Sequence, residues 1–116
     1  VVEMVKMPFA LKANISTPFS KKRLMEEWQK LDLDSELYDK KVSELSGGQR
    51  QRIIISTLGL LQKPIVLADE PTSALDAHTT ALVLNYLKAL ASKGATVITV
   101  SHDPAFANGC DKKVII

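Results

Sequence analysis

Two short apolar segments flanking an amphipathic one constrain the fold most strongly. Residues 65–68 form a continuous apolar run after a proline, which is typical of a fully buried parallel strand. Residues 96–100 are rich in β-branched side chains and predict a second strand. Residues 77–93 between them predict a helix, with Asp76 as its N-cap. A strand, helix and strand in this order form a βαβ unit, so we expect the α/β class with a parallel sheet.

Further elements are predicted on both sides of this unit from caps and periodicity. They are a helix over residues 1–12 kinked near Pro8, a helix over 21–31 capped by Ser20, helices over 48–61 and 104–107, and a third strand over 113–116. The inward-facing residues are expected to be Leu24, Trp28 and Leu31 in the helix over 21–31, and Val83, Leu87 and Leu90 in the helix over 77–93. We therefore divide the chain into a helical part, residues 1–44, and an α/β part, residues 45–116.

Composition excludes several classes of protein. Hydrophobic residues make up 46% and charged residues 24% of the 116 residues, as in an ordinary globular domain. A net charge of +2 gives no argument for nucleic acid binding. The single cysteine, Cys110, excludes an internal disulfide framework and fits a reducing compartment. No apolar run approaches the roughly 18 residues that cross a bilayer.

Residues 46–49, Ser-Gly-Gly-Gln, precede and begin a predicted helix. Glycines there allow unusual backbone conformations and a close approach of a ligand, and the free N–H groups of a helix start attract phosphate. Ser46 and Gln49 also have the spacing of a capping box, which would start a helix without any ligand. Both interpretations stay open at the level of this pattern.

Asp69 and Glu70 follow the first predicted strand, at the sheet edge where ligands of α/β proteins bind. Asp69 suits Mg²⁺, and Glu70, pointing the other way along the pleat, could orient or deprotonate an attacking water. His102 follows the second strand and is expected at the same edge. The alternatives are two solvated carboxylates and an ordinary loop histidine. His78, at a helix start, is interpreted as having no functional role.

In order and spacing, four segments together resemble the ATP-binding cassette (ABC) ATPases. Residues 45–52 (LSGGQRQR) resemble the signature motif, 65–71 (IVLADEP) the Walker B motif, 73–76 (SALD) the D-loop and 101–103 (SHD) the switch histidine. The similarity extends from about residue 42 to the end, and residues 1–44 fit the helical subdomain of that family only in character. The resemblance implies a P-loop NTPase-like parallel sheet preceded by a helical subdomain.

The resemblance also implies roles for individual residues. Asp69 would support Mg²⁺, Glu70 would polarise the attacking water, and His102 would sense the γ-phosphate of ATP. The signature residues would contact ATP held by the opposite subunit of a head-to-tail dimer, and Asp76 would link the two sites. The implied cofactor-binding residues are Ser46, Gly47, Gly48, Gln49 and Asp76.

The sequence departs from the family at the phosphate-binding loop. It contains no G-x-x-x-x-G-K-[S/T] segment and no family-type Q-loop glutamine, since Gln29 lies within a predicted helix. We therefore interpret the chain as the C-terminal portion of a longer ABC ATPase, and expect these residues alone to hydrolyse no ATP.

The expected partners are a second ATPase subunit and the transmembrane subunits of a transporter, with no nucleic acid. The expected location is cytoplasmic, as a peripheral subunit on the inner face of the membrane. Two alternatives stay open. One is a non-transport ABC ATPase acting in DNA repair or translation, and the other is a split or degenerate protein that binds partners without hydrolysing ATP.

Overall fold

The computed structural model describes residues 1, 5–6, 19–73 and 75–110. The predicted helix over 1–12 falls mostly outside the described residues, and the predicted strand over 113–116 falls entirely outside them. The chain divides into two compact units, Val1–Gln62 and Lys63–Ile116. The division predicted at residue 44 would instead place the helix that follows Ser46 with the α/β part, and it stays a prediction from the sequence.

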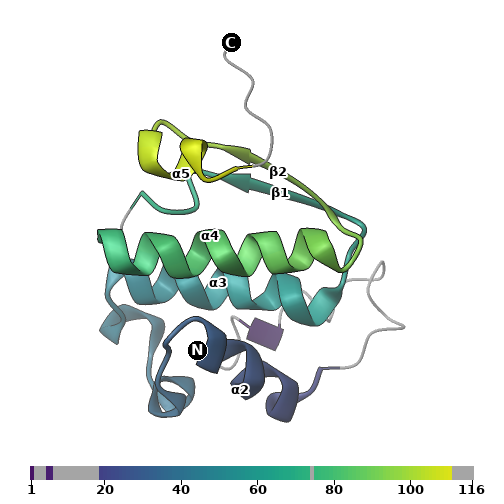
Figure 1. Ribbon diagram of the computed structural model, residues 1–116. Coiled ribbons are helices and arrows are strands. Elements are labelled where there is room, and N and C mark those ends of the chain that lie inside the picture. Colours follow the sequence, from purple (N-terminus) through teal and green to yellow (C-terminus); the bar gives the residue numbers. More distant parts are fainter. Residues whose placement is uncertain (2–4, 7–18, 74, 111–116) are drawn as a thin grey trace. The chain divides into compact units, whose positions relative to one another are not determined.

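The first unit is helical (Figure 1). Its elements are α2 (Lys21–Lys30), the 3₁₀ helices η2 (Ser35–Asp39) and η3 (Val42–Glu44), and α3 (Gly47–Leu61). Ser20 caps α2 as predicted, since its side chain accepts the Arg23 N–H at 3.3 Å. Leu31 is the C-cap, so the helix ends one residue earlier than expected.

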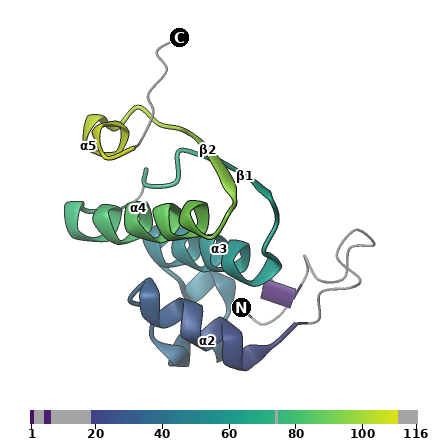
Figure 2. The same cartoon turned by 45° about the vertical axis from the view of Figure 1, so that its right-hand side comes forward.

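α2 packs beside α3, as two views of the ribbon show (Figures 1 and 2). The predicted inner face of α2 is confirmed, because Leu24 and Leu31 are 0% exposed and Trp28 is 1% exposed. The Trp28 indole N–H donates to the Ser56 hydroxyl of α3 at 3.2 Å, which satisfies two buried polar groups together. Tyr38 meets the Trp28 ring edge-on, with centroids 6.3 Å apart. These contacts lie in the core of the first unit.

The second unit contains the predicted βαβ sequence of elements. They are β1 (Ile65–Asp69), α4 (Ala77–Ser92), β2 (Thr96–Val100) and α5 (Pro104–Asn108). The strands pair in parallel, with Ile65 opposite Thr96 and Asp69 opposite Val100. α4 ends before Gly94, whose φ of 109° lies in the left-handed region that glycine tolerates. The predicted α/β class is therefore confirmed.

The burial of β1 and of one residue of α4 differs from expectation. Val66 is 3% exposed, but Ile65 and Leu67 on the other face of β1 are 61% and 74% exposed. The prediction of a fully buried strand is wrong here, because α4 lies along one side of the β1–β2 pair and no described element of this unit covers the other (Figures 1 and 2). In α4, Val83 and Leu87 are buried as expected. Tyr86 joins them, whereas Leu90, in the last turn, is only half-buried.

The exposed face of the strand pair leads to a prediction about association. Its apolar side chains are Ile65, Leu67, Ile98 and Val100, each more than half exposed. We expect residues 1–116 alone to self-associate through this face, because burying each such side chain is worth about 1.5–3 kcal/mol. Leu67→Lys should weaken association by about tenfold or more, measured by light scattering over a concentration series.

Ala81→Lys serves as the matched control, since it adds the same charge at an exposed position of α4. It should leave association unchanged. A monodisperse monomer of the unsubstituted chain with a sharp thermal transition would contradict the prediction.

Candidate functional site

The residues that the sequence singles out in the first unit lie at the start of α3. Ser46 is the N-cap, and its hydroxyl accepts the Gln49 N–H at 3.0 Å. The Gln49 side-chain oxygen accepts the Ser46 N–H, also at 3.0 Å. The predicted capping box is therefore confirmed. Ser46 and Gly47 are exposed, and Gly48 and Gln49 are half-exposed, so this helix start is accessible.

The two glycines act differently from the expectation that they supply unusual backbone conformations. Among the described residues, φ is positive only at Asp32, Gln62, Glu70 and Gly94. Gly47 and Gly48 are ordinary first-turn residues of α3 instead. The reason is that the capping box holds the helix start in regular geometry. What the glycines offer is the missing side chain, which leaves the first backbone N–H groups of α3 open to a ligand.

The candidate residues of the second unit gather beyond the C-terminal ends of the two strands. Asp69 is the last residue of β1 and is exposed. Glu70 follows with φ of 48°, and its N–H donates to the Val100 carbonyl at 2.7 Å. The expectation that Glu70 continues the pleat is therefore wrong, because the left-handed turn takes it out of the strand.

Glu70 and His102 are in contact. One Glu70 carboxylate oxygen, Oε1, accepts the backbone N–H of His102 at 3.2 Å and lies 3.6 Å from the imidazole Nε2. The His102 side chain is 93% exposed and that of Glu70 is 33% exposed. The prediction that both residues share one sheet edge is supported by this geometry. The pair can hold or move a proton at an accessible edge of the sheet.

Asp76 lies at the start of α4 and acts there as a helix cap. Its carboxylate accepts the Thr79 N–H at 2.8 Å, as the local sequence predicts. His78 is exposed in the first turn of the same helix. The candidate residues thus fall into two groups, one in each unit: Ser46–Gln49 in the first, and Asp69, Glu70, Asp76 and His102 in the second.

The carboxylates do not form a protein-only metal cage. Within residues 19–73 and 75–110, no three His, Cys, Asp or Glu side chains converge on a point that could hold a metal ion. Asp69 is thus a single accessible carboxylate, a donor set that suits Mg²⁺ shared with phosphate oxygens rather than a buried structural metal.

Sequence reasoning gave no role to Arg52, which lies within residues 45–52, three positions beyond the signature segment Ser46–Gln49. Its guanidinium reaches the carbonyl oxygens of Leu31 and Asp32 beyond the end of α2, and that of Gly48 within α3. The signals in the sequence are its place within residues 45–52 and its position one helical turn after Gly48, which puts the two on one face.

The cap at Asp76 can be tested separately from any other role. Asp76→Ala should lower the free energy of unfolding by about 1 kcal/mol, because the Thr79 N–H loses its acceptor. Asp76→Asn should lower it by only a few tenths of a kcal/mol, because asparagine caps equally well. What it loses is the interaction of a negative charge with the helix dipole. Urea unfolding of both variants measures the difference. Equal losses for Ala and Asn would show that the carboxylate charge, not the cap, matters.

Comparison with known proteins covers most of the chain. A sequence model of the family described as "ABC transporter" matches residues 11–73. The phosphonates import ATP-binding protein PhnC of Lactobacillus acidophilus is 43% identical over 104 residues, which are 88% of this chain and 40% of that protein. The macrolide export ATP-binding/permease protein MacB of Campylobacter jejuni is 42% identical over 83% of this chain and 16% of that protein. The chain therefore spans less than half the length of these relatives.

A solved structure agrees with these relatives. A bacterial ABC transporter cassette, determined as a dimer, superimposes with a TM-score of 0.78 at 33% identity, over 93% of this chain and 48% of that one. The same cassette in a post-hydrolysis state bound to ADP and Pi matches equally well. The predicted P-loop NTPase-like fold is therefore confirmed. No helix among the described residues has the length and apolar character to span a membrane.

Proposed function

This chain belongs to the ABC transporter family, and we propose that it works as part of a transporter's ATP-hydrolysing subunit. One observation carries the proposal. Glu70 and His102, at the ends of neighbouring parallel strands, hold a carboxylate and an imidazole in contact at an open sheet edge. This is the edge at which α/β proteins bind nucleotides. In the proposal, Glu70 orients the attacking water and His102 senses the γ-phosphate.

The residues present fit ATP with Mg²⁺. Asp69, next to Glu70, offers one exposed carboxylate group. This suits Mg²⁺, which takes its other ligands from phosphate and water. Mg²⁺ bound there would neutralise charge on the phosphates during hydrolysis. The chain has no phosphate-cradling loop, so a second segment of protein must supply that contact.

The signature segment is proposed to bind a nucleotide held by a partner subunit. Its support is the accessible start of α3, where Ser46, Gly47 and Gly48 present a hydroxyl and unhindered N–H groups at the positive end of the helix dipole. Gln49 holds this arrangement through the capping box. In a head-to-tail dimer, Asp76 would link the two nucleotide sites while capping α4.

Coupling to transport is proposed from the relatives, which are named for phosphonate import and for macrolide export. The corresponding partners are a second ATPase subunit and membrane-spanning subunits, with this chain at the cytoplasmic face of the membrane. A non-transport role in DNA repair or translation lacks such support.

The catalytic assignment is tested in a complete cassette that carries this sequence together with a phosphate-binding loop. Glu70→Gln should keep ATP binding but lower the hydrolysis rate by about 10²-fold or more, because an amide orients water poorly and takes up no proton. The glutamine oxygen can still accept the His102 N–H, so the local structure should persist. Steady-state ATPase and equilibrium ATP binding measure the two effects.

Glu26→Gln is the matched control for that experiment, since Glu26 is an exposed carboxylate on α2. It should retain full ATPase activity. Near-normal turnover of Glu70→Gln would refute the assignment.

The signature role is tested with Gly48→Leu. The added side chain should block ATP-driven dimerisation while leaving the ATP affinity of the monomer unchanged, because the nucleotide that Gly48 serves belongs to the partner. Gly48 has helical geometry, so leucine should not destabilise α3. Light scattering with and without ATP follows dimerisation, and Gly48→Ala, with a smaller side chain, should have a smaller effect. A matching fall in monomer affinity would contradict the role in trans.

A further inference from the structure

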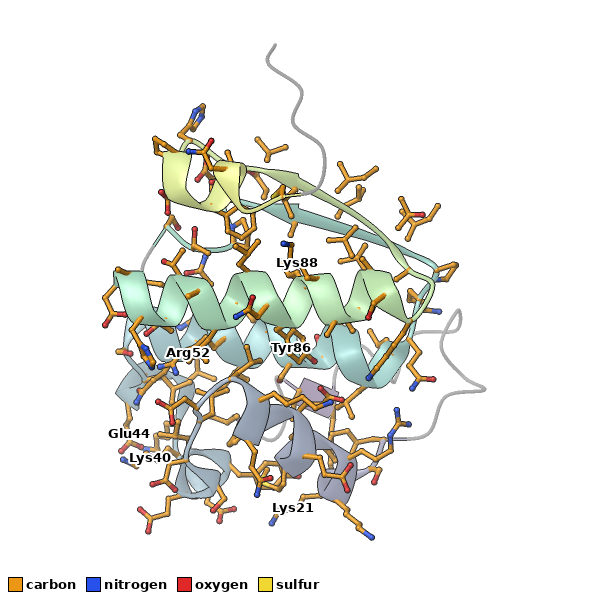
Figure 3. The ribbon with its side chains drawn as sticks, viewed as in Figure 1. Lys21, Lys40, Glu44, Arg52, Tyr86 and Lys88 are labelled. Atoms are coloured by element: carbon orange, nitrogen blue, oxygen red, sulfur yellow. The ribbon has the colours of Figure 1, made fainter. Side chains whose placement is uncertain are left out.

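Arg52 joins the start of α3 to the end of α2 (labelled in Figure 3). Its Nη1 donates to the Leu31 carbonyl at 2.8 Å and to the Asp32 carbonyl at 3.1 Å. Its Nε donates to the Gly48 carbonyl at 3.3 Å. One side chain therefore touches both the turn that follows α2 and the first turn of the signature helix.

The chemistry of this contact favours a fixed geometry. The acceptors beyond α2 are carbonyl groups at the negative end of a helix dipole, where a cation is stabilised. Leu31 is 0% exposed, so its carbonyl lies in the packed interior of the unit. A planar guanidinium carries donors on separate nitrogens, so Nε and Nη1 reach the two sides at once, whereas all donors of an ammonium lie on one nitrogen. The contact thus fixes the distance between the Gly48 turn and the end of α2.

A second link between the same two helices lies one turn further along α3. There the Trp28 indole N–H donates to the Ser56 hydroxyl, in the buried core. This link holds the two helices together but does not touch the signature segment. The two links therefore differ in what they hold. The Ser56 link joins the two helices in the core, and the Arg52 link also contacts Gly48.

We propose that Arg52 is a positioning residue, which sets the start of α3 against α2 so that the signature segment can engage a nucleotide on a partner subunit. This inference rests on the proposed function of that segment. A displacement of about 1 Å at such a contact is enough to lose much of its effect. Arg52 itself touches no nucleotide in this proposal, and it acts through the Gly48 carbonyl.

The test compares Arg52→Ala with Ser56→Ala in a complete cassette that carries this sequence. Each variant removes one link between α2 and α3, so both should lower the thermal unfolding temperature. Arg52→Ala should weaken ATP-driven dimerisation by about tenfold, because the signature segment loses its fixed position against α2, with unchanged ATP affinity of the monomer. Ser56→Ala should leave dimerisation intact. A purely structural role of Arg52 would instead give losses of dimerisation in proportion to the losses of stability, which would overturn the proposal.

Arg52→Lys provides a second variant that keeps the charge and much of the length. It should fold and recover only part of the dimerisation, because one ammonium replaces a fork that reaches two sites. Full recovery would show that charge alone suffices and would refute the positioning role. The unsubstituted cassette separates the two hypotheses. If it does not dimerise with ATP, the proposed function fails and the inference falls with it. If it dimerises and Arg52→Ala does so equally well, only the inference fails.

Discussion

Parallel backbone hydrogen bonding between β1 and β2 places Asp69 opposite Val100, and the Glu70 N–H extends the pairing to the Val100 carbonyl. Because the strands run in the same direction, the residues that follow each of them emerge at one edge. Glu70 and His102 are 32 positions apart in the chain, yet their contact needs only this pairing and the left-handed turn at Glu70. The candidate chemistry of the second unit therefore depends on the register of one strand pair.

Helix starts show why local structure alone does not identify a functional residue. Ser20, Ser46 and Asp76 each cap a helix with a side-chain oxygen, and the three caps have the same geometry in kind. Only Ser46 and Asp76 lie in segments that resemble a nucleotide-binding family. A cap satisfies the first N–H groups beyond it and leaves others open, so capping and ligand binding are compatible at one residue.

The sequence predicts most elements of this fold because each depends on local signals. Caps and periodicity locate α2, α3 and α4, and β-branched composition locates β2. The left-handed turn at Glu70 was missed, because glutamate has no preference for that region and tertiary pairing imposes it. The contacts of Arg52 were missed for a similar reason: they join residues about twenty positions apart, which only the packing of α2 on α3 brings together.

The strand β1 shows how a correct pattern can give a wrong burial. Its continuous apolar run is typical of a strand covered on both faces, and Val66 is covered while Leu67 is not. The pattern reflects the environment in which such a strand is stable, and the described residues of the second unit supply only one covering layer, α4. The matching cassette is about twice as long as the aligned part of this chain. An exposed apolar face of this kind is stable when further protein covers it. The proposed role of Glu70 makes a separate demand, because it needs a phosphate-binding loop that residues 1–116 do not contain.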